Sequence, residues 1–345
     1  MEFIIMTNKN FDRRDFLKLS ALSMGALAMT PLPQSIIGKS GPKYVMVGNK
    51  KGVSIHKEAT DKSMILYQRY LDDIINVYYE VTGEDGPEYN PLWYRVWGGY
   101  VHSANLVTVQ YILNPVETSV KEAGQLVEVT VPYTRSLLYS KTYGWEQAYR
   151  FYYGSVHWVV DIITGPDDKP WYKIKDELLK TELAAPAEHF RYISDEELSP
   201  ISPDVPEGKK WIEISVYHQT LKAYEDTRMV LDTKISSGTA YIEERKTPIG
   251  KFHIQTKMPS KHMGDGLLTS NIYAYELVGV PWNCFFNKGI ATHGTFWHSN
   301  FGSQMSHGCV NMRTEDAKWL YRWTTPVASP DDWTKNGYGT VVIVN

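Results

Sequence analysis

The chain has 345 residues and a formal net charge of -3, with 43% hydrophobic and 22% charged residues. This length exceeds one typical core, so two or three domains are expected. The near-neutral charge and the absence of a clustered Lys/Arg stripe exclude a basic footprint for nucleic acid. The 24 Tyr and 11 Trp favour mainly β structure, because aromatic side chains suit half-buried pleated surfaces.

The N-terminal segment, residues 1–40, has the layout of a secretory signal followed by a linker. The paired Arg13 and Arg14 precede an uncharged stretch at residues 19–33, which contains the small-residue tripeptide at 26–28. A twin arginine before a short apolar stretch is typical of the twin-arginine export route. We therefore expect a protein of the cell envelope, periplasmic or extracellular, that touches the membrane only through this segment if it is uncleaved.

A faint internal repeat follows the signal. Residues 86–96, GPEYNPLWYRV, are similar to residues 165–174, GPDDKPWYKI, and each copy is surrounded by short aromatic segments and Gly/Pro/Asp turns. This pattern predicts two small β-barrels, one over residues 41–115 and one over 116–198. The Trp-Tyr-Arg/Lys-Val/Ile strand resembles those of bacterial SH3-like modules.

The texture of the sequence changes after residue 198. Residues 199–208, rich in Pro and Ser, are typical of a linker. Residues 211–216 alternate apolar and polar side chains and predict a half-buried strand, and residues 340–344 predict another. Residues 314–321 predict a short helix that begins with Thr314 as its N-cap. We expect residues 209–345 to form a β-rich domain with this one helix.

The chain has two cysteines, and one of them, Cys309, lies in the segment SHGCVNM, Ser306 to Met312. Four interpretations compete for it: a buried thiol, a disulfide with Cys284, a metal ligand and a nucleophile. The polar neighbours argue against burial, and the apolar surroundings of Cys284 suit a buried free thiol. No HxxxH or CxxC spacing supports a metal, so no metal is expected.

The nucleophile interpretation fits the neighbouring residues. A thiol with an ordinary pKa near ~8.5 is mostly protonated at neutral pH, so it needs a base, and His293 and His307 lie nearby in sequence. Gly308 allows a substrate to approach the backbone closely. A helix starting just after Cys309 would also favour the thiolate.

The motif His293-Gly294-Thr295, followed after a spacer by Ser306-His307-Gly308-Cys309-Val310-Asn311-Met312-Arg313, resembles the active-site signature of the L,D-transpeptidases of the YkuD-like family. The resemblance extends over residues 209–345. It implies that Cys309 is the acylated nucleophile, that His293 is its base with the Gly294 backbone holding the imidazole, and that His307 and Gly308 line the catalytic pocket. It also implies an oxyanion hole made by the Gly308 and Cys309 N–H groups. The implied substrate-binding residues are Gly294, Thr295, Ser306, Asn311 and Arg313.

Other histidines and aromatic residues have less specific expectations. His298 is expected in a solvated loop, and His253 and His262 in a strand and a loop, with His262 at the edge of the cleft as an alternative. The large aromatic residues of the same region are expected in the core or the cleft wall; they are Tyr273, Tyr275, Trp282 and Trp297.

The resemblance implies a reaction without a cofactor. Donor and acceptor stem peptides of peptidoglycan are the implied partners, and a Cys309 thioester the implied intermediate, giving 3→3 cross-links. Two alternatives stay open: an L,D-carboxypeptidase that uses water as the acceptor, and a wall-binding protein with an inactive catalytic domain. A papain-like protease lacks its expected His and Asn downstream of the cysteine.

Overall fold

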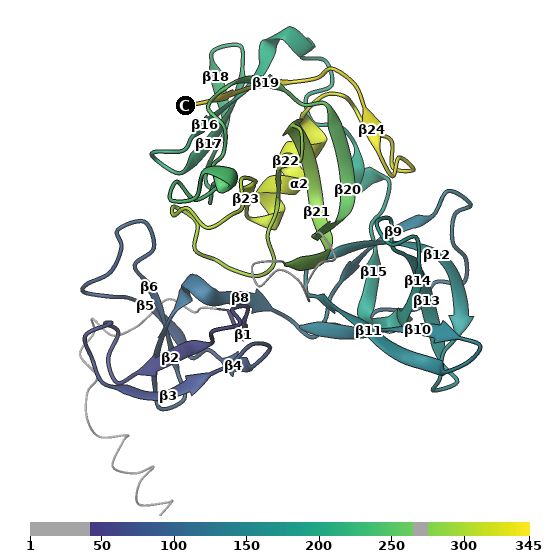
Figure 1. Cartoon of the computed structure of the whole chain (residues 1–345), viewed down its shortest axis with the longest axis horizontal. Coiled ribbons are helices and arrows are strands. Elements are labelled where there is room, and N and C mark those ends of the chain that lie inside the picture. The colour runs from purple at the N-terminus through teal and green to yellow at the C-terminus, as the bar shows by residue number, and fades with distance from the viewer. Residues whose placement is uncertain (1–41, 265–274) are drawn as a thin grey trace, which may run out of the picture. The chain divides into compact units, whose positions relative to one another are not determined.

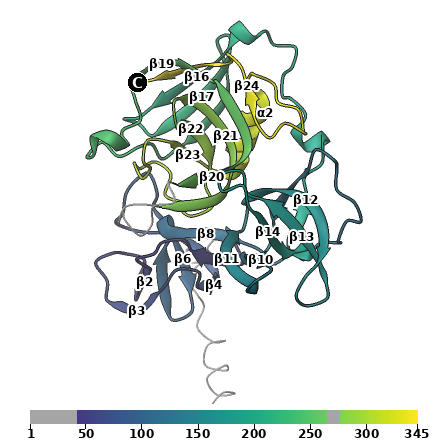
Figure 2. The same cartoon turned by 45° about the vertical axis from the view of Figure 1, so that its right-hand side comes forward.

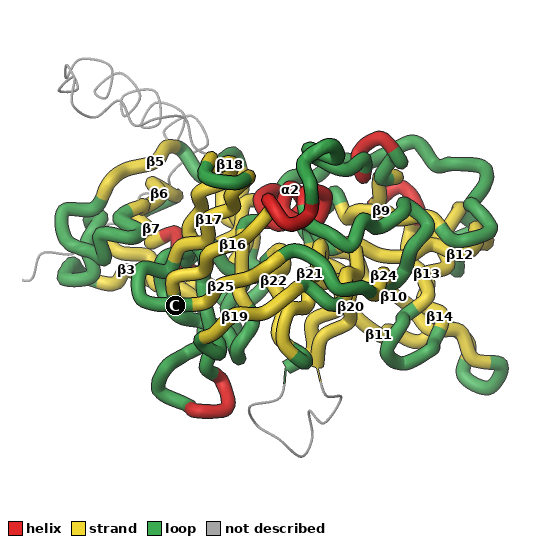
Figure 3. The backbone as a smooth tube through the Cα atoms, turned by 90° about the horizontal axis from the view of Figure 1, so that it is seen from above, coloured by secondary structure: helices red, strands yellow, loops and turns green. Residues whose placement is uncertain are grey.

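The computed structural model of the chain describes residues 42–264 and 275–345 (Figure 1). The predicted signal and Tyr273 lie outside these residues. The described part is mainly β, as the yellow strands of Figure 3 show, and it contains one α-helix besides short 3-10 helices. None of its helices has the length and apolar character needed to span a membrane.

The first β module contains eight strands and its own small core. They are β1 (Tyr44–Val47), β2 (Val53–His56), β3 (Ile65–Arg69), β4 (Ile74–Asn76), β5 (Tyr79–Thr82), β6 (Leu92–Val96), β7 (Gly99–His102) and β8 (Leu106–Val109), with the 3-10 turn η2 (Ser103–Asn105) before β8. They form two sheets, β4-β1-β8 and β3-β2-β7-β6-β5. Alternate strand residues such as Val45, Ile55 and Val101 point inward and fill the core.

The second β module forms one sheet of seven strands in the order β11-β10-β14-β13-β12-β9-β15. The strands are β9 (Gln125–Val129), β10 (Tyr133–Ser140), β11 (Gly144–Tyr152), β12 (Val156–Thr164), β13 (Pro170–Lys175), β14 (Glu182–Pro186) and β15 (Phe190–Tyr192), with η3 (Ala187–His189) before β15. Phe151, Tyr172 and Phe190 are its largest core side chains.

The two modules have the same strand order. The long β12 pairs with both β9 and β13, and so replaces the pair of short strands β4 and β5 of the first module. The repeated sequence segments fall in equivalent hairpins, β5–β6 and β12–β13. In each hairpin a glycine, Gly83 or Gly165, lies so close to a tryptophan, Trp93 or Trp171, that a Cβ would approach the indole to 2.5 or 2.2 Å.

The third unit contains two five-stranded sheets, β18-β17-β16-β25-β19 and β23-β22-β21-β20-β24. Its strands are β16 (Lys210–Ser215), β17 (Thr220–Glu225), β18 (Arg228–Lys234), β19 (Gly250–His253), β20 (Thr256–Gly264), β21 (Glu276–Asn287), β22 (Ile290–Gly294), β23 (Val310–Met312), β24 (Lys335–Asn336) and β25 (Val341–Val344). Figure 2 shows β20, β21 and β22 side by side. Two strand pairs are parallel: β16 with β25, and β22 with β23.

The helix α2 (Thr314–Trp323) packs on β21 and β22. It confirms the predicted helix, and it buries Ala317, Leu320 and Trp323 against the sheet. The residue at the N-cap position is Arg313, whose side chain makes no capping hydrogen bond, so the N-cap prediction for Thr314 is wrong by one residue. Acidic side chains in the first turn still suit the positive end of the helix dipole.

The segment before the third unit is held against that unit. Ile201 donates its N–H to the Arg322 carbonyl at 3.2 Å, and Lys210 Nζ donates to the Ile201 carbonyl at 3.0 Å. Ile201 also packs against the core of the third unit. The predicted linker at 199–208 therefore connects the units without being a free tether.

The core of the third unit extends into the second β module. Leu126, Trp158 and Leu198 belong to the same buried cluster as Ile212 and Trp282. The Trp158 ring also stacks on Trp333, with 4.6 Å between ring centroids. The second module and the third unit thus share one hydrophobic core.

Candidate active site

The parallel pair β22–β23 brings the two halves of the sequence motif together. His293 lies opposite Asn311, and Thr292 opposite Val310. Side chains alternate between the two faces of a sheet. Thr292 and Val310 are therefore on one face, where both are buried, while His293 and Asn311 share the other face. Cys309 precedes Asn311 by two residues, which places its thiol on the face of His293.

A cavity of about 220 Å³ opens on that face. Of the residues expected in the site, five line it: His293, Ser306, His307, Cys309 and Asn311. The remaining lining residues are Gly48, Met263, Tyr275, Leu277, Trp297 and Met305. The side chains of Tyr275 and Trp297 are thus part of the cavity wall, whereas Trp282 is buried in the core, in agreement with the expected roles.

The Cys309 thiol is half-buried at the start of β23. Burial raises its pKa, and a hydrogen bond from the Ala291 backbone offsets part of this increase. The resting sulfur is therefore a thiol, and it needs a base to react. A short strand, β23, separates Cys309 from α2, so the expected position directly before a helix start is wrong, and the helix dipole does not act on the sulfur.

His293 is arranged as a neutral base. Its Nδ1–H donates to the Gly294 carbonyl at 2.9 Å, which leaves the lone pair on Nε2. Burial lowers the pKa of His293 to about 4, although the hydrogen bond to Gly294 opposes the shift. At neutral pH the imidazole is uncharged and ready to accept a proton on Nε2.

The loop that carries Cys309 is fixed by glycine and hydroxyl groups. Gly308 has φ of 117°, a conformation that favours glycine. The Thr247 hydroxyl donates to the Gly308 carbonyl at 2.8 Å, and the Ser306 hydroxyl donates to the Cys309 carbonyl. The Gly308 N–H donates to Ser306 Oγ at 3.1 Å, so it is already engaged. The expectation that this N–H is free for an oxyanion hole is therefore wrong, and the Cys309 N–H is left as the candidate donor.

His298 is buried, so the expectation of a solvated loop position is wrong. It is 3% exposed, because it belongs to a loop that folds inward after Phe296 and Trp297. Its Nε2 lies 2.9 Å from the Asn311 amide, and its Nδ1 accepts from the Asn300 N–H at 3.2 Å. Burial, and secondarily the charge of His293, lower the pKa of His298 to about 3. A neutral His298 thus orients Asn311 in the wall of the cavity; the aromatic run before it was the available signal of burial.

Three of the expected substrate-binding residues do not line the cavity. Gly294 contributes its carbonyl to His293, and Thr295 is buried. The Arg313 guanidinium lies over the Phe301 ring, 5.2 Å from its centroid, and donates to Thr233 Oγ1 at 3.5 Å. Arg313 therefore braces the start of α2.

The exposed His307 ring lies on Tyr275, with 4.9 Å between ring centroids, at the mouth of the cavity. Partial burial, followed by the charge of Arg245, lowers the pKa of His307. A neutral His307 is suited to contact with a substrate at this mouth.

The remaining cysteine and histidines lie apart from the cavity. Cys284 is a free cysteine with a buried side chain. It lies opposite Thr292 in the β21–β22 pair, so its thiol is on the other face of the sheet from Cys309, and this excludes the disulfide. His253 belongs to β19, and His262 is buried in β20, away from the cleft edge. No group of three or more potential metal ligands occurs in residues 42–264 and 275–345.

Gly48 of the first β module lines the same cavity, and no sequence motif pointed to this residue. A Cβ at this position would lie 2.2 Å from the Trp297 carbonyl oxygen. The backbone of the first module is therefore in close contact with the backbone of the cavity wall at Trp297.

In comparison with known proteins, residues 209–344 match the model of the YkuD family, described as an L,D-transpeptidase catalytic domain. The chain is 25% identical over 135 residues to the putative L,D-transpeptidase YciB of Bacillus subtilis, which covers 34% of this chain and 63% of that protein. It is 33% identical over 87 residues to L,D-transpeptidase 1 of Mycobacterium tuberculosis, covering 22% of this chain and 33% of that protein. The chain thus spans less than two thirds of the length of these curated relatives.

Two solved structures are similar to part of the chain. The L,D-transpeptidase from Xylanimonas cellulosilytica is 27% identical, with a TM-score of 0.29, over 39% of this chain and 60% of that one. The catalytic domain of an L,D-transpeptidase from E. faecium is 23% identical, with a TM-score of 0.30, over 39% of this chain and 96% of that one.

Proposed function

We propose that this protein is a cysteine-dependent L,D-transpeptidase of peptidoglycan stem peptides, because residues 209–344 match the model of the YkuD family of L,D-transpeptidase catalytic domains. The observation that supports this best is the pairing of β22 with β23, which puts Cys309 and His293 in one cavity. A second supporting observation is the neutral His293, whose Nδ1–H is held by Gly294.

In the proposed acylation step, His293 Nε2 takes the Cys309 proton as the sulfur attacks the carbonyl carbon of the third residue of a donor stem. The Cys309 N–H donates to the developing oxyanion. When the carbon–nitrogen bond breaks, the protonated His293 gives its proton to the departing D-Ala amine. A thioester on Cys309 remains.

In the proposed transfer step, the side-chain amine of a neighbouring stem attacks the thioester. His293 takes a proton from this amine and returns it to the departing Cys309 sulfur, so the enzyme is regenerated and a 3→3 cross-link is formed. Water as the acceptor would give an L,D-carboxypeptidase. The presence of Cys309 and His293 in one cavity argues against the second alternative, a wall-binding protein with an inactive catalytic domain.

Acylation by a carbapenem tests the nucleophile. The catalytic domain of the E. faecium relative is known in a form acylated by ertapenem. We expect ertapenem to add its mass once to this protein and not to the Cys309→Ala variant. Cys284→Ala is the matched control, since it removes the other, buried thiol and keeps acylation. Wild-type labelling at a residue other than Cys309 would overturn the proposal.

The base is tested by the rate of the same reaction. His293→Ala should lower the acylation rate by on the order of 10²–10⁴, the usual contribution of a positioned acid–base group. Unchanged acylation in His293→Ala would assign the base elsewhere.

Defined muropeptides distinguish the acceptors. Tetrapeptide stems incubated with the protein should yield 3→3 cross-linked dimers with release of D-Ala, detected by mass spectrometry. Tripeptides without dimers would indicate the carboxypeptidase, and no product would contradict both enzymatic functions.

We also propose that the protein is exported by the twin-arginine pathway and that the two β modules are SH3-like units which hold the catalytic domain at the wall. The Arg13-Arg14 pair supports the first point, and the shared strand order of the modules supports a duplicated unit. Export should fail when both arginines are replaced by lysine. Fractionation of cells that express each form measures this.

A further inference from the structure

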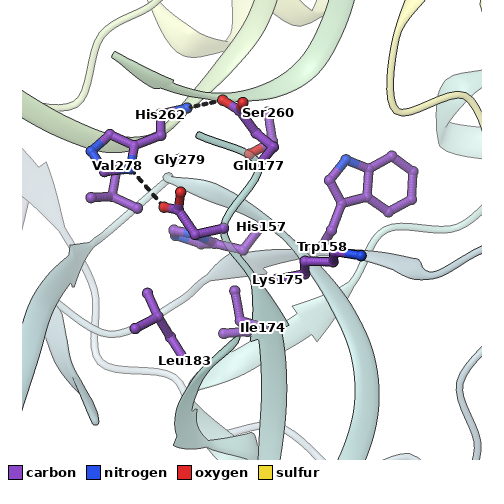
Figure 4. A pocket seen from close by; sticks show the side chains of 11 residues that line it. His157, Trp158, Ile174, Lys175, Glu177, Leu183, Ser260, His262, Val278 and Gly279 are labelled. Atoms are coloured by element: carbon purple, nitrogen blue, oxygen red, sulfur yellow. Dashed lines mark hydrogen bonds and ion pairs between the residues drawn. The ribbon is translucent and has the colours of Figure 1, made fainter. Parts of the chain in front are cut away.

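A buried cluster of charged side chains joins the second β module to the hairpin β20–β21. Figure 4 shows His262 of β20 facing the loop after β13, with His157 and Glu177 close by. Asp176 and Glu177 come from that loop, and Glu276 begins β21. The space lined by His262, Asp176 and Glu177 is about 10 Å³, enough for a water molecule and too small for a ligand. The cluster therefore serves to connect the second β module to β20 and β21, and it is not a ligand-binding site.

His262 lies between two carboxylates. Its Nδ1 is 2.6 Å from Asp176 Oδ2, and its Nε2 is 3.2 Å from Glu276 Oε1, the second contact being an ion pair rather than an aligned hydrogen bond. The side chains of His262 and Asp176 are each 1% exposed. Only the imidazolium has a proton on both nitrogens, so this arrangement fits a positively charged His262.

Four further groups surround these side chains. Glu177 Oε1 accepts from the His262 N–H at 2.7 Å and from Lys261 Nζ at 2.8 Å. The Tyr149 hydroxyl of β11 donates to Glu276 at 2.9 Å, and its ring meets the His262 ring edge to face. The remaining facing group, His157 of β12, stays neutral, since burial lowers its pKa to about 3.

Charge balance depends on His262. Three carboxylates, Asp176, Glu177 and Glu276, meet two cationic side chains, Lys261 and a protonated His262. Without the proton on His262, Asp176 and Glu276 would share no cation, although both are largely buried. Removing one partner of a buried pair is strongly destabilising, because it leaves a charge without compensation.

The cluster is adjacent to the catalytic cavity along the chain. His262 precedes Met263, and Glu276 lies between Tyr275 and Leu277. Met263 and Leu277 are paired across the hairpin, and Met263, Tyr275 and Leu277 all line the cavity that contains Cys309. The backbone positions fixed by the cluster thus determine where one wall of this cavity lies.

We propose that His262 is a positioning residue: protonated between Asp176 and Glu276, it lets the second β module hold the β20–β21 wall of the catalytic cavity in its binding geometry. This inference rests on the proposed function for its substrate effect, since the wall would contact the acyl donor. The role concerns binding of the donor and not the chemistry at Cys309.

The direction of the pH effect follows from the charges. Burial opposes protonation of His262, but Asp176, Glu276 and Glu177 outweigh it and raise its pKa. The contribution of the cluster is therefore complete below the ordinary histidine pKa of about 6.5 and is lost as pH rises through the raised value. The half-saturating ertapenem concentration should rise as pH increases through the raised pKa of His262. The acylation rate at saturating ertapenem should instead depend on the protonation states of Cys309 and His293.

The first measurement needs no variant. In the full chain with ¹³C-labelled histidine, the His262 resonance should titrate above pH 6.5, and amide exchange at Met263 and Leu277 should accelerate as it deprotonates. A His262 titration at or below pH 6.5 would overturn the proposal, whether or not the protein is acylated. Absence of wild-type acylation would contradict the proposed function alone.

Variants then test the wall. His262→Gln should raise the half-saturating ertapenem concentration about tenfold at pH 6 and remove its alkaline rise, with a saturating rate close to wild type. Glu276→Gln keeps an acceptor for Tyr149 and should shift the rise to lower pH, which provides a second test if His262→Gln does not fold. Asp161→Asn, an exposed partner of Lys173 in the same module, is the matched control and should behave as wild type. Wild-type half-saturation and pH dependence in Glu276→Gln would overturn the proposal.

Discussion

The two β modules have the same strand order but contact the catalytic domain in different ways. The first module meets it through polar and backbone contacts: Asn90 donates to Asn300 at 3.2 Å, and Lys234 Nζ donates to the Tyr89 carbonyl at 2.7 Å. The second shares a hydrophobic core with it and adds the buried His262 cluster. A common topology therefore does not fix how a module is attached.

Equivalent positions explain this difference. Val47 and Val129 pair with the residue that follows the 3-10 turn of their module. Three residues earlier, the first module has the pair Tyr44–Asn76, and the second has Leu126–Trp158. Asn76 is exposed, whereas Leu126 and Trp158 are buried in the shared core. The same position on this strand is thus beside an exposed polar residue in the first module and beside a buried apolar residue in the second.

The largest effect is expected at this pair. Trp158→Ala should lower the free energy of unfolding by about 3–5 kcal/mol, because it empties a large site in the shared core. Asn76→Ala, its counterpart in the first module, should stay within about 0.5 kcal/mol of wild type, as exposed substitutions do. Urea unfolding measures both. Equal effects would mean that the two modules are attached alike.

The next effect concerns the approach of the first module to the cavity. Gly48→Ala should lower stability by about 1–3 kcal/mol, the usual range for overpacking, because its Cβ would lie 2.2 Å from the Trp297 carbonyl. Ertapenem binding should weaken as well, since Gly48 lines the cavity. Gly86→Ala, where a Cβ meets nothing within 4 Å, is the control. Thermal unfolding and acylation kinetics measure both variants. Equal stability and equal ertapenem binding in Gly48→Ala and Gly86→Ala would contradict the contact between Gly48 and Trp297.

A third prediction uses acid unfolding. Burial pushes the pKa of Glu197 up, but the Arg191 and Lys318 side chains outweigh this effect and lower it to about 2. A carboxylate whose pKa is lowered in the folded protein stabilises the fold at every pH above the ordinary pKa of glutamate. This contribution to the free energy of unfolding is lost as pH falls towards 2. In Glu197→Gln the free energy of unfolding should therefore fall less steeply with decreasing pH below about pH 4.5 than in the wild type.

The surface pair Lys62–Asp85 of the first module is the matched test for Glu197. Asp85→Asn should change the loss of stability at low pH less than Glu197→Gln does, because a surface ion pair with a largely exposed lysine contributes little. Denaturant midpoints at a series of pH values measure both variants. A larger change in Asp85→Asn than in Glu197→Gln would reverse the comparison.

The smallest effect is expected at the polar contact of the first module. Lys234→Met removes an exposed side chain that donates to the Tyr89 carbonyl, and the change in stability should remain within about 0.5 kcal/mol. A loss above about 2 kcal/mol in thermal unfolding would show that the polar contact anchors the first module as firmly as a core.

Much of the fold could be predicted from the sequence. Alternating apolar residues in 211–216 predicted β16, and the helix after the motif was found within a few residues of its limits. The repeated Gly-Pro and Trp-Tyr segments led to equivalent hairpins. These features are local: the side-chain period and the turn residues contain their signal.

The sequence alone determined the candidate residues for the chemistry, because His293, Ser306 and Cys309 stand in a motif that resembles the active-site signature of the L,D-transpeptidases. Only the tertiary structure decided the surroundings of that chemistry. It buried His298 behind Asn311, engaged the Gly308 N–H with Ser306, and brought Gly48 to the cavity. It also placed His262 between Asp176 and Glu276. Gly48 and Trp297, which approach each other at the cavity, are 249 positions apart in the chain. A sequence separation of that size leaves no period or motif that could be recognised in the sequence.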